Sequence, residues 1–124
     1  MQEILNILKI LSDEIRLKIV YLLSQESELC VCELMEALKM SQSRISNHLR
    51  ILRNTGIIEA KREGKWMFYC LKRDKMDKAI LNIIVNITKT IDKEGYLTEE
   101  KELVKKLISK RGELSGSRKN LSTG

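Results

Sequence analysis

The sequence has no proline, a single histidine and few aromatic residues, which make up 4% of its 124 residues. Without proline no helix is broken from within, and a core poor in aromatics has to be built from Leu and Ile, which favours helices. With one histidine the chain has no Ser-His-Asp/Glu set, and it also lacks a glycine-rich phosphate loop and a His-Glu-x-x-His motif. We therefore expect that the protein is not an enzyme.

Long apolar runs and a secretion signal are missing too. Residues 1–14 carry acidic side chains among the apolar ones and have no small-residue cleavage site. The longest apolar stretch, residues 80–91, is interrupted by polar side chains and is too short to cross a bilayer. The three cysteines are an odd number, and two of them are nearly adjacent, which makes a poor disulfide framework. These features predict a cytoplasmic protein with reduced thiols and no membrane partner.

Charge is unevenly distributed along a chain that is long enough for one domain. Residues 41–78 carry ten basic and four acidic side chains, whereas residues 1–40 carry four basic and seven acidic ones. A basic segment that follows an acidic one is better explained by binding to a polyanion than by a diffuse charge that keeps the protein soluble. A run of charge is also typical of a solvated face, so charge alone does not establish nucleic-acid binding.

The spacing of the apolar residues predicts six helices. We expect them over residues 4–11, 12–24, 31–38, about a dozen residues between Ser41 and Gly56, 74–91 and 98–110. The first is apolar nearly all round, which indicates a buried helix. The third and fourth are joined by a short turn, which is typical of a helix-turn-helix unit.

Between the fourth and fifth helices the apolar period changes to two. Residues 57–62 and 65–71 flank Glu63-Gly64, which predicts a β-hairpin, or wing, with glycine in its turn. The predicted fold is therefore mainly α with a small β-hairpin, a winged helix-turn-helix.

The helix that follows Ser41 is predicted to read DNA. At 100° per residue, Ile45, Leu49 and Leu52 form one buried stripe, and small polar residues opposite let the helix enter a major groove. An ordinary surface helix would be richer in Glu and Lys. Candidates for base contacts are Gln42, Ser43, Arg44, Ser46 and Asn47, and candidates for phosphate contacts are Arg50, Arg53, Lys61, Arg62 and Lys65, with His48 as a packed residue or a further phosphate contact. The expected partner is double-stranded operator DNA.

The fifth helix has an apolar surface too wide for one flank of so small a core. Together with the first helix it is expected to cover a partner subunit in a homodimer, although one ordinary core helix is the alternative. The residues of this interface would be Ile4, Leu8, Leu11, Ile80, Ile84, Ile87 and Ile91. Residues 1–92 would then form the DNA-binding and dimerisation domain, and residues 93–124 a C-terminal extension with one helix and a disordered tail from residue 115.

Two thiols, Cys30 and Cys32, stand at the expected start of the third helix. In a regular helix their sulfurs point about 200° apart, but a first turn can unwind and bring them together. Thiolates select thiophilic ions such as trivalent arsenic and antimony or divalent cadmium and lead, whereas zinc would want four N/S ligands. Both cysteines could also be packing residues, or a switch that responds to oxidation.

Three segments carry a resemblance to a known family. Leu29-Cys30-Val31-Cys32-Glu33-Leu34, the run 41–49 and the wing Gly64-Lys65-Trp66…Tyr69-x-Leu71 resemble the ArsR/SmtB family of repressors, in particular its arsenic-responsive branch. The resemblance implies a dimeric winged helix that represses a resistance operon and leaves the DNA when arsenite, or antimonite, binds the thiols. The bound ion would unwind the start of the third helix, which supports the recognition helix, so that the two reading heads lose the spacing of one DNA turn.

One position departs from the family pattern. Relatives often place a third cysteine three residues after the second, where this chain has Met35. Cys70 is the other candidate ligand, because the segment before the third helix commonly pairs with the end of the second wing strand in this fold. Alternation directs Tyr69 and Leu71 into the core, so Cys70 is expected to face the other way. A water, an added thiol or a two-coordinate site remains an alternative.

Overall fold

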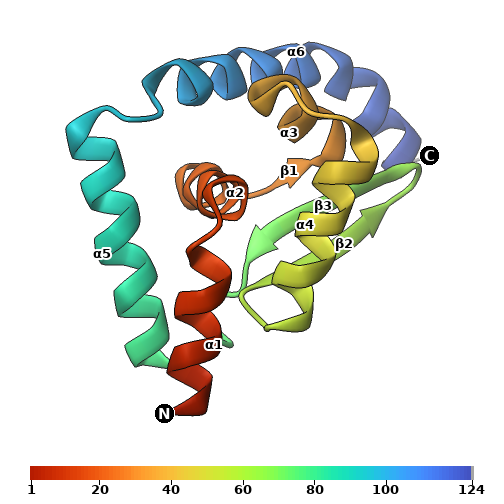
Figure 1. The fold of residues 1–124 in the computed structure, drawn as a ribbon. Helices are drawn as coiled ribbons and strands as arrows, with labels where there is room; N and C mark the ends of the chain where they lie inside the picture. The colour runs from red at the N-terminus through yellow and green to blue at the C-terminus, as the bar shows by residue number, and fades with distance from the viewer. Residues whose placement is uncertain (124) are drawn as a thin grey trace.

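The computed structural model describes the backbone of residues 1–123 and the side chains of residues 1–111. Helices α3 and α4 form a helix-turn-helix, and strands β2 and β3 form a wing after it (Figure 1), so the predicted winged helix-turn-helix is confirmed. In chain order the elements are α1 (Gln2–Leu11), α2 (Glu14–Gln25), β1 (Leu29–Cys30), α3 (Val31–Leu38), α4 (Gln42–Asn54), β2 (Ile58–Glu63), β3 (Trp66–Leu71), α5 (Lys78–Glu94) and α6 (Thr98–Thr123).

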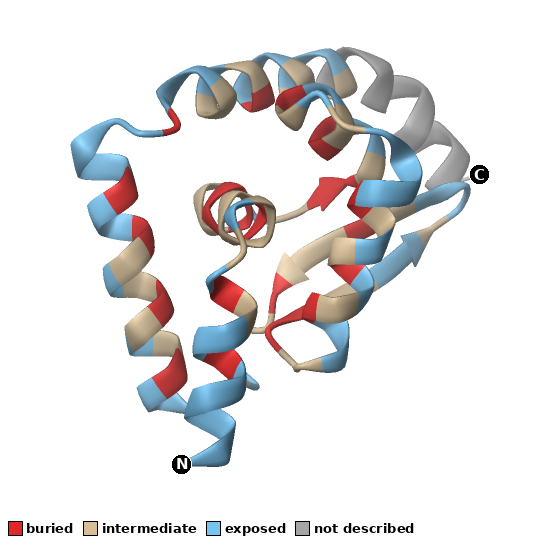
Figure 2. Ribbon diagram, viewed as in Figure 1, coloured by how far each residue is buried: buried red, intermediate tan, exposed pale blue. Residues whose placement is uncertain are grey.

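Helix α2 is the centre of the core. All five residues from 19 to 23 are buried, and α1, α4, α5, α6 and strand β3 pack around them (Figure 2). The helix begins at a side-chain cap, because Asp13 Oδ1 accepts a hydrogen bond from the Arg16 amide at 3.0 Å. That amide hydrogen bond holds the pKa of the Asp13 carboxyl below its usual value. The N-cap is thus Asp13, whereas the predicted helix began at the preceding residue, Ser12.

The sheet is antiparallel, in the order β1-β3-β2, and its two faces have different neighbours. Successive residues of a strand point to opposite faces. One face, with Leu29, Tyr69 and Leu71, packs on the core. The other, which we call the second sheet face, carries Cys30 opposite Phe68. Cys30 and Phe68 are buried, yet neither belongs to the main core cluster, so the second sheet face buries residues of its own.

Helix α1 does not lie in the interior, so the prediction of a buried first helix was wrong. Ile7 and Leu11 pack on the core, whereas Ile4, Leu5 and Leu8 are 40%, 51% and 48% exposed. The helix lies at one end of the molecule beside α5 (Figure 1), where a single protomer covers only one of its sides. Apolar residues all round therefore leave an apolar outer face.

Helix α5 turns most of its predicted interface residues inward. Ile80, Ile84 and Ile91, like Leu11 of α1, are buried within the protomer, and Ile87 is partly buried. They pack on the core because α5 runs against α2. The parts of the predicted interface that stay exposed in one protomer are therefore the outer face of α1 and part of Ile87.

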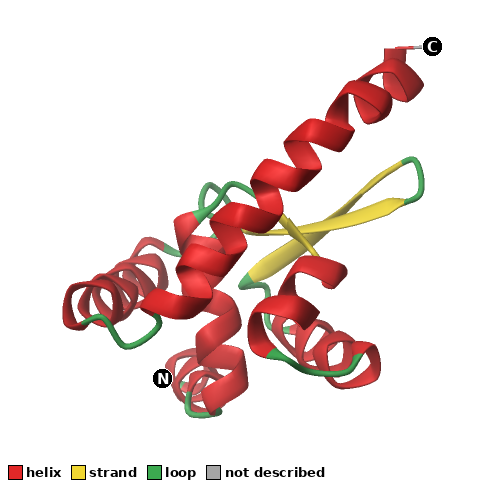
Figure 3. Cartoon of the chain, turned by 90° about the horizontal axis from the view of Figure 1, so that it is seen from above, coloured by secondary structure: helices red, strands yellow, loops and turns green. Residues whose placement is uncertain are grey.

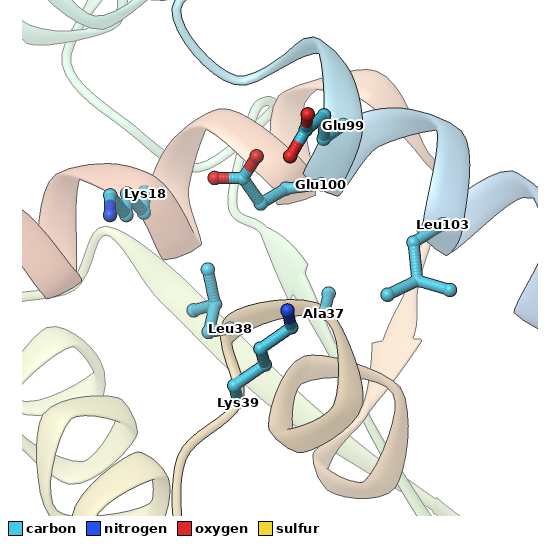
Figure 4. A pocket seen from close by; sticks show the side chains of 7 residues that line it. All are labelled: Lys18, Ala37, Leu38, Lys39, Glu99, Glu100 and Leu103. Carbon is cyan, nitrogen blue, oxygen red and sulfur yellow. The ribbon is translucent and has the colours of Figure 1, made fainter.

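Helix α6 crosses α2 and α3 (Figures 1 and 3), and its Arg111 reaches Phe68 on the second sheet face. Tyr21 Oη donates to Asp92 Oδ1 at 2.6 Å, and Lys101 Nζ lies 2.8 Å from the same oxygen, which ties α2, α5 and α6 together. Where α6 crosses, a hollow opens that is lined by Lys18, Ala37, Leu38, Lys39, Glu99, Glu100 and Leu103 (Figure 4). The helix begins at the predicted Thr98, and the predicted disordered segment, 115–124, lies outside the residues whose side chains are described.

None of the described helices combines the length and the apolar character needed to cross a membrane.

Candidate functional site

The helix-turn-helix is built from local signals that the sequence shows. Lys39 ends α3 in the left-handed conformation (φ 54°, ψ 51°), and the Met40 amide donates to the Met35 carbonyl at 3.1 Å. Two residues later Ser41 caps α4, because its Oγ accepts from the Arg44 amide at 3.4 Å. Ile45, Leu49 and Leu52 are buried, which confirms the predicted stripe. The turn and the stripe together fix the rotation of α4 on α3.

The opposite side of α4 is open. Ser46 is half-buried, and the other polar residues named as base and phosphate candidates on this helix, Gln42, Ser43, Arg44, Asn47, Arg50 and Arg53, are exposed. Arg50 Nη2 donates to Asn47 Oδ1 at 2.7 Å, so the guanidinium is already held over the middle of the exposed face. Arginine and asparagine are the side chains that make bidentate contacts with guanine and adenine.

His48 is the exception among the candidates on α4. Its side chain is 14% exposed, and Nδ1 lies 3.9 Å from Asp13 Oδ1 at the start of α2. This Nδ1 is buried and has no hydrogen-bond partner among the described residues. The ring therefore packs between α4 and α2, as one of the two sequence interpretations expected, and lies off the exposed face.

The wing carries its cations at the tip. Lys61, Arg62 and Lys65 are exposed, and Gly64 makes the turn between the strands with a φ of 61°. Lys61 Nζ lies 3.5 Å from Glu63 Oε1, two residues further along the same strand. An exposed ion pair of this kind is worth about 0–1 kcal/mol, so the lysine is easily released to a phosphate.

The two neighbouring thiols lie at the junction of β1 and α3, in different environments. Cys30 is the N-cap residue of α3, is 3% exposed, and points to the second sheet face. Burial raises the pKa of its thiol to about 11, and a hydrogen bond from the Glu33 backbone offsets part of this. Cys32 lies in the first turn of α3 and is exposed. The resting junction thus holds one protected and one accessible sulfur.

Cys70 lies on the same sheet face as Cys30. The register pairs Cys30 with Phe68, and Cys70 follows two residues later on β3. Cys70 points away from the core, as expected. Cys30 also points away from the core, so the two thiols lie on the same side of the sheet. The Cys70 Sγ donates to Glu59 Oε1 at 3.8 Å, and burial and the nearby carboxylates raise its pKa.

The donor chemistry fits a thiophilic ion, but the donors are not gathered around one point. Within the described residues there is no group of three His, Cys, Asp or Glu side chains placed to hold a metal. Met35, three residues after Cys32, packs against the core. A shared ion would therefore require the β1–α3 junction to open and release Cys30 from the second sheet face.

Two further residues at this junction were not identified from the sequence. The Glu33 carboxylate, 5% exposed as a residue, accepts from the Cys30 amide at 2.9 Å through Oε1 and from Arg111 Nε at 2.8 Å through Oε2. Glu33 stands three residues after the N-cap, where a capping-box acid is expected, so a local signal was present. Arg111 is 78 positions away from Glu33 and has no local signal.

Known proteins are similar to this chain over its winged-helix part. Residues 13–60 match the family described as "Bacterial regulatory protein, arsR family". An HTH-type transcriptional regulator of Methanocaldococcus jannaschii is 40% identical over 75 residues, which cover 60% of this chain and 84% of that protein. The chain belongs to the ArsR family.

Other members of the ArsR family extend beyond the matched part. The arsenical resistance operon repressor of Escherichia coli is 51% identical over 67 residues, so the match spans 54% of this chain and only 57% of that protein. The solution structure of the homodimeric winged helix-turn-helix DNA-binding domain of a possible ArsR-family regulator from Mycobacterium bovis superposes with a TM-score of 0.60 at 25% identity. That match covers 73% of this chain and 80% of the domain.

Proposed function

We propose that this ArsR-family protein is a transcriptional repressor that binds operator DNA as a homodimer and is released when a thiophilic ion binds its cysteines. Trivalent arsenic, as arsenite, is the proposed inducer, and antimonite is the second choice. The observation that carries the proposal is the position of Cys30 and Cys32 at the first turn of α3, the helix that supports the recognition helix α4.

The DNA-binding part of the proposal is supported by the exposed surface. The exposed side of α4 presents Arg44 and the Asn47–Arg50 pair, and the wing tip presents exposed cations. α4 would enter the major groove, and the wing would contact the phosphate backbone. His48 is left out of the proposed contacts because its ring packs toward Asp13.

The homodimer is supported by the outer face of α1. Ile4, Leu5 and Leu8 are large apolar residues that one protomer leaves exposed. A second copy would cover them, and the M. bovis relative is described as homodimeric. Two recognition helices set one DNA turn apart would then contact two half-sites.

The thiols would convert ion binding into a change at α3. Cys30 has to leave the second sheet face before it can share an ion with Cys32, because Cys30 is buried on that face whereas Cys32 is exposed in the first turn of α3. That movement removes the cap of α3 and shifts the support of α4. Cys70 is the proposed third donor, because the strand register places it two residues from Phe68, the cross-strand partner of Cys30, and so next to the junction.

A redox switch is less well supported by the same geometry. Oxidation would begin at the exposed Cys32 and then need Cys30 to complete a disulfide, and because Cys30 is buried with a raised pKa, that second step should be slow. A cadmium- or lead-responsive repressor of the same fold stays the alternative, because these ions use the same thiolates.

The proposal is tested by fluorescence anisotropy of the reduced protein on a DNA fragment from upstream of its own gene, titrated with arsenite. We expect release near one equivalent of ion per site, and loss of this response in a Cys30→Ser/Cys32→Ser protein that still binds DNA. Binding that arsenite, antimonite, cadmium and lead all leave unchanged would refute ion sensing. Release by peroxide but not by arsenite would favour the redox switch.

The matched variant for the third donor is Cys70→Ser. If Cys70 is a ligand, its removal weakens arsenite binding while DNA binding without the ion stays the same. If the arsenite titration of Cys70→Ser equals that of the parent protein, the site consists of Cys30 and Cys32 alone.

A further inference from the structure

Helix α6 touches the thiol junction through one side chain. Arg111 Nε lies 2.8 Å from Glu33 Oε2, and Arg111 Nη2 lies 3.4 Å from the Glu28 carbonyl. The Arg111 guanidinium also stacks 5.1 Å from the centre of the Phe68 ring, which is the cross-strand partner of Cys30. Arg111 therefore contacts Glu28 and Glu33, which flank Cys30 in the chain, and Phe68, which lies opposite it.

The Glu33 carboxylate connects this arginine to the cap of α3. One of its oxygens accepts from the Cys30 amide, and the other accepts from Arg111. Both side chains are largely buried, with 7% and 15% exposure for Glu33 and Arg111. A buried carboxylate held on both oxygens has little freedom to rotate, so α6 fixes the geometry of the first turn of α3.

We propose that Arg111 is a positioning residue of the ion switch, which holds Glu33 in place and so keeps Cys30 capped and buried until the inducer binds. This inference rests on the proposed function, and it assigns a role to α6, which lies beyond the residues that match the family. To share an ion with Cys32, Cys30 must leave the second sheet face, and the Cys30–Glu33 hydrogen bond must break. Arg111 opposes both changes, and therefore it sets the inducer concentration at which the repressor responds.

The chain offers a matched control on the same helix. Lys101 ties α6 to Asp92 with a contact of 2.8 Å near the start of the helix, whereas Arg111 lies near its middle. Lys101→Gln and Arg111→Gln each remove one cation of α6: the first loses the ion pair with Asp92, and the second loses those with Glu33 and Glu28. Only Arg111→Gln removes a contact to the thiol junction, so a difference between the variants separates positioning of Cys30 from general docking of α6.

The first measurement needs no ion. In a Cys32→Ser/Cys70→Ser background Cys30 is the sole thiol, and its alkylation rate by iodoacetamide reports how often the junction opens. Arg111→Gln should raise this rate about tenfold, and Lys101→Gln should leave it within about twofold. Equal rates in both variants, whether raised or unchanged, would overturn the proposal.

The second measurement uses the chain with all three cysteines. Arsenite affinity is measured without DNA, by competition with a thiol-reactive arsenical dye, for the parent, Arg111→Gln and Lys101→Gln. Arg111→Gln should bind arsenite about tenfold more tightly than the other two, because less work is needed to free Cys30. Faster alkylation with unchanged arsenite affinity would overturn the positioning role. A parent that binds no arsenite would refute the proposed function instead, and the alkylation rates would still decide whether α6 holds Cys30.

Discussion

The buried thiol of Cys30 leads to a prediction that separates two kinds of inducer. Burial raises its pKa from 9.0 to about 11, so that at neutral pH the thiolate fraction is about 10⁻⁴. A divalent cation such as cadmium binds the thiolate and sends the proton into solution. Cadmium affinity should therefore increase at least tenfold per pH unit, or at least about a hundredfold between about pH 6.5 and 8.5, and more steeply if more than one thiol loses a proton.

Arsenite should behave differently, because arsenous acid is neutral and brings its own hydroxides. Each new As–S bond replaces an As–O bond, and the thiol proton leaves with the hydroxide as water. With two thiols, As(OH)₃ gives a dithiolate As–OH and two waters, with no net release of protons. The arsenite affinity is therefore expected to be flat over the same pH range, although the binding rate should increase with the thiolate fraction.

The assay is calorimetric titration with each ion in two buffers of different ionisation enthalpy, which counts the protons released. The raised pKa of Cys30, whose largest cause is burial, makes its thiolate about a hundredfold scarcer than at a pKa of 9.0, or about 2.7 kcal/mol. Cys30→Ser should lower the cadmium proton count by one. A cadmium affinity that stays constant with pH in the parent, or an arsenite affinity that follows the cadmium slope, would refute the reasoning.

Three further predictions concern DNA, the protomer contact and the tie between helices. Arg44→Ala should weaken binding to the operator by about 1–3 kcal/mol and leave binding to nonspecific DNA nearly unchanged, whereas Lys65→Ala should weaken binding to both DNAs alike. Both affinities are measured by anisotropy at one fixed salt concentration. Equal losses for the two variants would contradict the assignment of Arg44 to bases and Lys65 to phosphates. Leu8→Glu should dissociate the homodimer in sedimentation equilibrium, because it places a charge in the middle of the outer face of α1, and an unchanged mass would exclude that face. Tyr21→Phe should lower the free energy of unfolding by about 0.5–1.5 kcal/mol in urea, since it removes the hydrogen bond to Asp92; an unchanged midpoint would show that the bond adds no net stability.

Much of the DNA-binding unit was predictable because its signals are local. Ser41 as a cap, the stripe of Ile45, Leu49 and Leu52 and the glycine turn of the wing all act within a few residues of their own position. The start of α3 at Val31 was also predicted, since the change from an extended segment to a helical period is visible in the sequence. In these segments the residues that determine a conformation are the ones that adopt it.

The tertiary structure decided which apolar surfaces are covered. An apolar helix can be buried or left open for a partner, and periodicity does not distinguish the two. α1 was predicted to be buried and has an open outer face, whereas α5 was predicted to expose an interface and turns Ile80 and Ile84 into its own protomer. The outcome depends on where α2 lies relative to both helices, which is a property of the packed core.

The thiol site shows the same division. The sequence by itself determined that Cys30 and Cys32 stand at a helix start, because two neighbouring positions need no long-range information. Whether Cys70 shares a face with Cys30 was decided by the register of β1 against β3, which joins residues far apart in the chain. The contact of Arg111 with Glu33 depends on the path of a whole helix across the fold, and a side chain 78 positions away can be placed there only by the packing of α6 on α3.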